Sequence, residues 1–457
     1  MLCTAIFSLF GLFVLNHFLC QFTTRQAVAN APQMPPVQPF DFRSKLPDLS
    51  FKPAPSAGRN EYELSKGYRF ALFSSVEELP KDWERAQPDN LFLQRAYLSV
   101  VEDNPPPRMR FSYLVFYKNN APVGVAYCQL SNFRPDRSVQ DLSVKPKYPC
   151  VIRAVSNSLK NFVASQFEHN LLVCGSLLLT GEHGFHFLPE AKLDKAAAFD
   201  LLEEALISTQ KHWEKKGLKL DGIFIKDIEE EHRAPGQVLV ARKFREFTFH
   251  PNMVMELPAA WKTFEDYLAA ITSKYRVRAK RAFKMATSLE KRELTENQII
   301  ANKTRLYELY KSVVDTASFN MTVLHENYMP DLKLRLGGRF RVTGYFQNGE
   351  LVGYFTTILN GRELEAHFLG FEQACNKDCH LYHNMLFDIL REGIERRVER
   401  VIYARTAMEI KSSVGAVAHE MFCYIRANNR LMNKILPTLL EYLRPPDDWV
   451  ARSPFKD

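Results

Sequence analysis

The feature that most constrains the fold is a pair of hairpins that repeat one another far apart in the chain. Residues 114–130 and 342–359 each consist of two apolar runs joined by a turn. The second turn is Asn348-Gly349, whose residues both accept positive φ, as tight β-hairpins require. In both copies the returning run reads Val-Gly, at Val123-Gly124 and Val352-Gly353. The pattern predicts two copies of one antiparallel unit.

A helix and a strand follow each hairpin in the same order. Helical periodicity with a Phe-Asp pair covers 199–217 in the first copy and 387–398 in the second, and apolar runs follow at 220–227 and 399–405. A helix between strands is the crossover that parallel neighbours need. We therefore predict an α/β fold class, with a duplicated unit on a mixed (α+β) sheet. The first copy holds about 41 more residues, which we expect around 131–149.

The length of the chain supports two domains. A chain of 457 residues with 46% apolar residues is too long for one ordinary core and has the composition of a globular protein. We predict an apolar leader and Pro-rich linker over 1–58, an N-terminal domain over 59–250, a C-terminal domain over 251–445 and a tail over 446–457.

The first twenty residues, MLCTAIFSLFGLFVLNHFLC, contain no Asp, Glu, Lys or Arg and could just span a bilayer. Three interpretations remain open: an export signal, a membrane anchor, or an upstream start codon that adds a non-native leader. The eight cysteines are scattered and do not resemble a disulfide framework, which indicates a reducing compartment. We therefore predict a cytoplasmic protein that is membrane-associated through residues 1–20.

The charge of the chain favours an anionic partner. The net charge is +8 and the calculated pI about 8.9, which suits a nucleotide cofactor, an acidic lipid surface or RNA. The predicted helix within 272–294 is densely basic and has no acidic i,i+4 partner before Glu290. We therefore select Arg276 and Lys280 as candidate anion-binding residues, with a solvated helix face as the alternative.

Polar residues in the predicted strand 363–370 suggest a reaction site. Alternation places Glu363, Glu365 and His367 on one face of that strand. A central strand covered on both faces should be apolar, so these residues indicate a cleft. A carboxylate two positions from an imidazole could act as a general base with its orienting partner, which makes Glu365 and His367 catalytic candidates. The alternative is an edge strand that faces solvent.

The segment after the last apolar run, ARTAMEIKSSVGA, places cations at a strand end. Arg405 and Lys411 flank Glu409, and we predict that both cations bind a phosphate or carboxylate of a substrate. Tyr403, at the end of the run, is the candidate general acid. A structural ion pair of the cations with Glu409 or another neighbour is the alternative.

Two loops precede the predicted helices. Residues 374–384 contain two cysteines and two histidines, but no second ligand pair has the usual spacing, so we predict no metal site. The helix that follows could hold a phosphate at its N-terminus. In the first copy, the equivalent loop 177–187 contains Gly181 and Gly184, which would let the backbone approach the anionic part of a donor.

The segments YARTAMEIKSSVGA, LYHNMLFDILREGI and SKYRVRAKRA together resemble the FemAB-like branch of the GNAT acyltransferase superfamily. The resemblance implies two tandem GNAT-like (acyl-CoA N-acyltransferase) domains over roughly residues 60–445. It also implies that the protein is an enzyme that transfers an acyl or aminoacyl group from an activated donor to an amine.

The same resemblance implies the ligands. No cofactor is expected to be tightly bound, and an acyl-CoA-type thioester is expected as the co-substrate. The partners would be this small-molecule donor and an amine acceptor, part of a cell-envelope or lipid precursor. One alternative is a tRNA-dependent aminoacyl transferase of the peptidoglycan-bridge type, and another is a catalytically silent GNAT-like module that binds a ligand.

Overall fold

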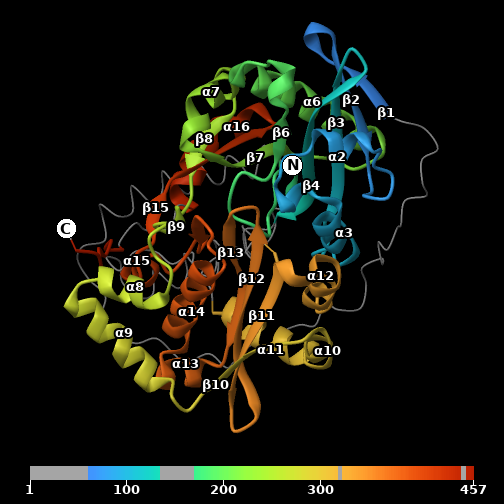
Figure 1. The fold of residues 1–457 in the computed structure, drawn as a ribbon. Coiled ribbons are helices and arrows are strands. Elements are labelled where there is room, and N and C mark those ends of the chain that lie inside the picture. Colours follow the sequence, from blue (N-terminus) through green and yellow to red (C-terminus); the bar gives the residue numbers. More distant parts are fainter. Residues whose placement is uncertain (1–59, 134–168, 317–321, 444–448, 457) are drawn as a thin grey trace, which may run out of the picture. The chain divides into compact units, whose positions relative to one another are not determined.

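The computed structural model of the protein describes residues 60–133, 169–316, 322–443 and 449–456. These residues belong to one of the two units into which the chain divides, Gly58–Asp457. Two mixed β-sheets form its framework (Figure 1). The predicted fold class, α/β with a duplicated mixed-sheet unit, is confirmed.

The first sheet is built mainly from the first half of the chain. Its strands lie in the order β1-β2-β3-β4-β5-β7-β16-β8, and β6 pairs with β4. They are β1 (Asn60–Glu63), β2 (Tyr68–Phe73), β3 (Arg110–Lys118), β4 (Ala121–Phe133), β5 (His169–Cys174), β6 (Phe185–Phe187), β7 (Gly222–Glu229), β8 (Arg245–Thr248) and β16 (Met421–Ala427). Strand β3 is apolar at most positions because both of its faces are covered: Leu114 and Val115 point into different core clusters.

The second sheet is built mainly from the second half. Its strands lie in the order β10-β11-β12-β13-β14-β9-β15. They are β9 (Asn252–Glu256), β10 (Glu290–Glu293), β11 (Phe340–Gln347), β12 (Glu350–Asn360), β13 (Glu363–Phe371), β14 (Arg400–Ile402) and β15 (Val417–His419). As in the first sheet, one parallel pair lies inside an otherwise antiparallel arrangement: β13 with β14, matching β5 with β7.

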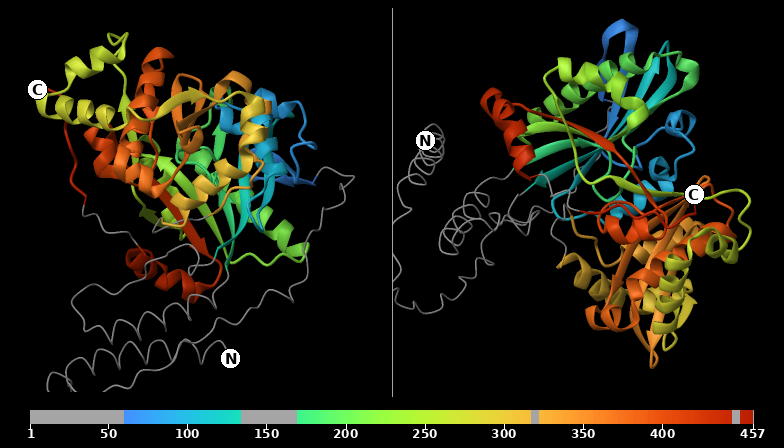
Figure 2. Two further views of the ribbon diagram at one scale, coloured as in Figure 1. Left: turned by 90° about the horizontal axis from the view of Figure 1, so that it is seen from below. Right: turned by 90° about the vertical axis from the view of Figure 1, so that its left-hand side faces the viewer.

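One strand of the second half lies in the first sheet. Strand β16, near the C-terminus, lies antiparallel between β7 and β8 in the first sheet. Strand β9, which follows β8 in the chain, lies antiparallel between β14 and β15 in the second sheet. The red strand beside the green strands in Figure 1 and in the right view of Figure 2 is β16. The second half therefore completes the first sheet, whereas all strands of the second sheet come from the second half itself.

Thirteen helices are found in the described residues. They are α2 (Asp82–Ala86), α3 (Arg95–Asp103), α6 (Lys195–Lys215), α7 (Glu230–Ala241), α8 (Phe264–Ala270), α9 (Ser273–Met285), α10 (Glu296–Ala301), α11 (Lys303–Val314), α12 (Tyr328–Leu336), α13 (Gln373–Cys379), α14 (Leu381–Glu395), α15 (Met408–Ser413) and α16 (Arg430–Leu443). The crossover helices α6 and α14 connect the parallel strands of their sheets.

The repeated elements predicted from the sequence are present with small shifts at their ends. The hairpins 114–130 and 342–359 correspond to β3–β4 and β11–β12, and the apolar runs 220–227 and 399–405 to β7 and β14. The additional residues expected around 131–149 lie mostly outside the described residues.

The two halves share a hydrophobic core. One cluster of buried side chains combines Tyr97 and Val115 of the first half with Tyr328, Val342 and Ile358 of the second. Each such side chain contributes about 1.5–3 kcal/mol when fully buried, so this joint cluster stabilises the contact between the halves. Two further large clusters are local, one around α14 and one around α6.

The predicted localisation needs correction. It combined a cytoplasmic location with membrane association through residues 1–20. A search of the described helices finds none with the length and apolar character that a membrane crossing requires. Residues 1–20 themselves lie outside the described part of the chain. The localisation prediction is therefore withdrawn.

Candidate functional site

A cleft of about 750 Å³ is lined by elements from both halves of the protein. Its walls come from β9, β13, β14, the turn between β12 and β13, the segment that joins β15 to β16, the loop between β5 and β6, and the start of α7. The volume is typical of sites for small molecules. The cleft is therefore the first candidate for a reaction site.

The lining of the cleft is strongly acidic, although the whole chain is basic. It contains nine carboxylates and two arginines, a formal excess of seven negative charges with the histidines neutral. The carboxylates are Asp89, Glu182, Glu229, Glu230, Glu231, Glu363, Glu365, Glu399 and Glu420. This charge favours cationic ligands and opposes phosphate or carboxylate groups.

Strand β13 contains a β-bulge beyond its cleft-lining residues Glu363 and Glu365. His367 and Phe368 together lie opposite Thr356 of β12. The Thr356 hydroxyl accepts a hydrogen bond from Phe368 N and donates one to Phe368 O, both at 2.9 Å. Strand β13 pairs with β14 only over Glu363–Glu365 and continues to Phe371, whereas β14 ends at Ile402. The cleft is lined by the paired part of β13, and the bulge lies further along the same strand.

Glu365 is the buried carboxylate of the lining. Its exposed fraction is 7%, and within the described residues its carboxylate has no hydrogen bond and no ion pair. Burial, with the neighbouring charge of Glu363, raises the pKa of Glu365 well above its usual range, and Arg400 opposes this only partly. A carboxyl group with a raised pKa is suited to take a proton from a bound ammonium group.

His367, two residues further along β13, belongs to a chain of hydrogen bonds across the two halves. Its Nε2 lies 3.0 Å from the Tyr328 hydroxyl, which lies 3.2 Å from the Tyr97 hydroxyl. Burial lowers the pKa of His367 to about 3, so the ring is neutral at physiological pH. His367 is therefore a weaker base than Glu365 and is held in place by a tyrosine.

Arg405 pairs with a carboxylate of the other half. It donates to both oxygens of Asp227 and, through Nε, to His250 O at 2.8 Å. Lys226 also donates to Asp227, which is fully buried and adopts φ +59°. Burial alone would raise the pKa of Asp227, but the charges of Arg405 and Lys226 lower it. The structure thus places Arg405 in an ion pair, although with Asp227 and not with Glu409.

Lys411 and Tyr403 are buried away from the cleft lining. Lys411 Nζ donates to the carbonyl oxygens of Ala404 and Arg405 at 3.2 and 2.5 Å, and burial lowers its pKa to about 7. The Tyr403 hydroxyl donates to Leu386 O at 2.8 Å inside the core around α14, and burial raises its pKa. Both side chains stabilise the local chain path. The structure does not bring them together with Glu365 around the cleft.

Gly181 and Gly184 belong to the loop between β5 and β6. Gly181 has φ +124°, and its N–H donates to Asp227 Oδ2 at 3.1 Å. A Cβ atom at Gly184 would lie 3.1 Å from Cys174 Sγ and from Gly175 N, so a larger residue would require these neighbours to shift. Gly181 lines the acidic cleft and Gly184 packs against β5. The cations beside this loop, Lys226 and Arg405, are already bound to Asp227.

Arg276 and Lys280 lie on α9, apart from the cleft lining. Helix α9 carries six cations, and within the described residues none of them forms an ion pair: Lys274, Arg276, Arg278, Lys280, Arg281 and Lys284. The helix packs against α14, where Asn384 Nδ2 donates to Ala282 O at 3.0 Å. The charge of Arg278 helps burial to lower the pKa of His383 to about 4. The unpaired cations of α9 thus lie near the N-terminal part of α14.

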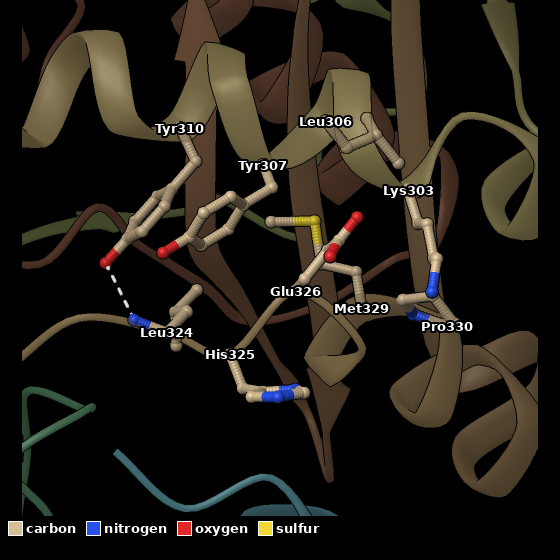
Figure 3. A pocket seen from close by; sticks show the side chains of 9 residues that line it. All are labelled: Lys303, Leu306, Tyr307, Tyr310, Leu324, His325, Glu326, Met329 and Pro330. Atoms are coloured by element: carbon tan, nitrogen blue, oxygen red, sulfur yellow. Dashed lines mark hydrogen bonds between the residues drawn. The ribbon is translucent and has the colours of Figure 1, made fainter. Parts of the chain in front are cut away.

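A second, much smaller cavity lies between α11 and the start of α12 (Figure 3). Its volume is about 10 Å³, which is room for one water molecule at most. In Figure 3, Tyr310 and Tyr307 lie side by side, and the Tyr310 hydroxyl accepts a hydrogen bond from Leu324 N at 3.3 Å. This cavity is too small for a substrate.

Several residues of the site were missed by sequence reasoning. The run Glu229–Glu231 was visible as three consecutive carboxylates after an apolar strand. Asp227 ends the apolar run 220–227, and Arg405 ends the corresponding run 399–405. This parallel could have suggested an ion pair between the halves. No sequence signal marked Asn252 or Tyr328, because both depend on which strands and helices meet in the fold.

The comparisons with known proteins concern the fold. No protein-family model matches this chain, and no curated protein matches it. Similar solved structures include FemX, with 11% identity over 83% of this chain and 99% of that chain and a TM-score of 0.48. A tandem GNAT protein from the clavulanic acid biosynthesis pathway has 10% identity over 79% and 99% of the chains, with a TM-score of 0.45. L-PGS from Bacillus licheniformis has 12% identity over 76% and 94%, with a TM-score of 0.39. The names of the first two structures contain FemX and tandem GNAT, which agrees with the FemAB-like/GNAT resemblance of the sequence.

Proposed function

We propose that the protein is an N-acyltransferase that moves an acyl group from an acyl-CoA-type thioester to an amine bound in the acidic cleft. The observation that carries this proposal is Glu365, a buried carboxylate without a partner among the described residues, which lines a cleft of suitable size. Cationic amines are the acceptors that such a lining favours.

In the proposed step the amine nitrogen forms a bond to the thioester carbonyl carbon, and the carbon–sulfur bond breaks. The ammonium group first loses a proton to Glu365, because only the neutral amine has a free electron pair. The thiol leaves with a proton, so the products are an amide and a free thiol. Tyr403 is left out of this step because its hydroxyl is bound to Leu386 O in the core.

The donor is proposed to lie beyond the end of β14, beside the part of β13 that continues to Phe371. This part of β13 contains the bulge at His367–Phe368. The N-terminal turn of α14 and the cations of α9, with Arg276 and Lys280 among them, would attract phosphate groups of the donor. In this arrangement negative donor groups and the positive acceptor meet oppositely charged parts of the protein. The resemblance further suggests an envelope or lipid precursor as the molecule that carries the amine.

The experiment is a transfer assay with acetyl-CoA and a panel of amines, measured by thiol release and by the mass of the amide product. We expect turnover by the full chain and its loss in the Glu365→Gln protein, with Glu395→Gln as the control. Glu395 is an exposed residue of α14 outside the cleft lining. Binding of CoA thioesters without turnover of any amine would instead support a catalytically silent module.

A second candidate is an aminoacyl transfer that uses tRNA as the donor. The six cations of α9 favour it, because unpaired Lys and Arg residues are what phosphate backbones bind. Binding of tRNA that weakens with salt and is lost on reversal of Arg276 and Arg278 would support this candidate. No binding at low salt would remove it.

A further inference from the structure

The cations in the cleft lining are already neutralised. Arg362 pairs with Glu399 at 2.7 Å, and Arg400 pairs with Glu363. Asp89, Glu229 and Glu420 come from three different segments, are exposed, and have neither a hydrogen bond nor an ion pair through their carboxylates in the described part of the chain. A ligand in the cleft therefore meets uncompensated negative charge from several sides.

Two buried polar side chains of the same lining also lack partners. Asn252 on β9 is 7% exposed, and its Oδ1 is buried without any hydrogen-bond partner in the described structure. Glu365 on β13 is equally buried and unpartnered. An unsatisfied buried acceptor is costly, and a ligand that donates hydrogen bonds would remove that cost. Both side chains offer acceptor oxygens, so the missing group is a donor.

We propose that the acceptor amine carries two or more positive charges and that the cleft binds an aliphatic polyamine or a lysine-rich peptide. The inference rests on the proposed function, because it identifies the class of the amine. One ammonium group lies near Glu365 and Asn252, and the others lie among Asp89, Glu229 and Glu420. An alkyl chain with spaced ammonium groups fits a cleft of about 750 Å³ that has acids on several walls.

A divalent metal ion fits this lining less well than an organic cation. Within the described residues no group of three or more histidine, cysteine or carboxylate side chains has the arrangement to hold a metal ion. The carboxylates are spread over strands and loops of both halves. Such spacing suits charges that are distributed along a chain.

The test is calorimetric titration of the full chain with spermidine, trilysine and n-butylamine. We expect spermidine or trilysine to bind at least about tenfold more tightly than n-butylamine, and the difference to shrink at high salt. Tighter binding of spermidine would indicate a polyamine as the natural ligand, and tighter binding of trilysine would indicate a lysine-rich peptide. Equal affinity for the three amines would overturn the inference.

Variants locate the binding. The triple variant Asp89→Asn, Glu229→Gln and Glu420→Gln should weaken spermidine binding about tenfold, because it removes three unit charges at roughly 8 Å in a water-like dielectric. The control triple Glu77→Gln, Glu265→Gln and Glu395→Gln changes the net charge equally at exposed positions outside the lining and should stay within about twofold of the unmodified protein. Equal losses in both triples would contradict a site in the cleft.

Calorimetry needs no donor, so the two proposals can fail separately. Spermidine binding in the cleft without any acyl transfer would refute the proposed function and leave this inference standing. Acyl transfer that proceeds equally well to n-butylamine would support the function and refute the polycationic acceptor.

Discussion

The two halves of the protein differ most where their sheets should be most alike. In the first half Gly124 lies opposite Phe187, and in the second half Gly353 lies opposite Phe371. In the second half, one continuous strand, β13, carries both Phe371 and the residues that pair with the parallel strand β14, and it contains a two-residue bulge. The first half has β5, then the loop 175–184, then β6. The bulge and the loop occupy the same place in the duplicated unit.

The residues opposite these two features correspond by register. Tyr127 in the first half is the counterpart of Thr356 in the second, three positions after each Val-Gly glycine. Tyr127 N donates to Gly184 O at 2.7 Å and Tyr127 O accepts from Gly175 N at 3.1 Å, so it holds the base of the loop. Thr356 holds the bulge through Phe368. Tyr127 uses its backbone and Thr356 its side chain, so corresponding positions hold two different chain paths.

Because of this difference, the two halves contribute unequally to the acidic cleft. The loop of the first half contributes Thr180 to His183 to a cleft whose buried carboxylate, Glu365, belongs to the second half. Glu365 lies opposite Ile358 of β12. The equivalent residue of β4 is Gln129, and the residue opposite it is Val173, so the first half has no carboxylate at this position. We infer that the second half supplies the reactive group and the first half supplies part of the binding surface.

The largest effect is expected from separating the halves. Residues 59–250, expressed alone, should lack cooperative thermal unfolding, because β16 would be missing from the sheet that it completes. Circular dichroism melts check this, with co-expression of residues 251–457 as the control. A sharp transition for 59–250 alone would show that the predicted domain boundary at 250 separates autonomous units.

The next largest effect concerns the reactive group. Glu365→Gln should lower kcat/KM for acyl transfer by about two to four orders of magnitude, because the general base is lost. Cys174→Ala in the first half should retain activity within about threefold, since this thiol is packed against Gly184. Both proteins are compared by steady-state kinetics. An active Glu365→Gln protein with unchanged kcat/KM would remove Glu365 from the mechanism.

The ion pair between the halves is expected to stabilise the fold. Asp227→Asn should lower the free energy of unfolding by about 3–5 kcal/mol, because it leaves Arg405 and Lys226 without their buried counter-charge. Urea denaturation measures the change. Asp378→Asn, at an exposed position on α13, is the control and should stay within about 0.5 kcal/mol. A small loss for Asp227→Asn would mean that the halves are held by the joint core alone.

A smaller effect is expected in the loop of the first half. Gly181→Ala should destabilise the protein by about 1–3 kcal/mol, because φ is +124° and the new Cβ would lie 2.7 Å from His183 Nε2. Gly217→Ala has positive φ without a nearby atom and should cost less. Thermal melts and spermidine titrations of both variants show whether the loop shape matters for the cleft. Equal losses in stability would indicate that the contact with His183 is unimportant.

The smallest effect is a change in pH dependence. Burial holds the pKa of His367 at about 3, below its usual value of 6.5, so the unfolded chain binds a proton that the folded protein does not. The stability from this group is complete above pH 6.5 and falls as the pH decreases towards 3. Between pH 6.5 and 5, the free energy of unfolding should therefore fall by about 1 kcal/mol less in the His367→Gln protein than in the unmodified protein. Urea titrations at several pH values measure this difference. Parallel curves for both proteins would contradict the buried, neutral ring.

Much of the architecture could be predicted from local patterns. The Val-Gly hairpins, the crossover helices and the apolar runs after them were recognised because turn residues and hydrophobic periodicity act over short distances. The placement of Glu365 on a strand with polar neighbours also followed from alternation. The placement of β16 in the first sheet could not be read in this way, because it pairs residues that are far apart in the chain.

The sequence by itself determined the duplicated α/β unit, the basic helix α9 and the candidate base, since each of these depends on residues that are close together. Only the tertiary structure decided what the charged residues do. It joined Arg405 to Asp227 and buried Tyr403 in the core. It also collected carboxylates from both halves into one cleft. The physical reason is that burial and charge neutralisation depend on which distant segments meet, and a local pattern does not contain that information.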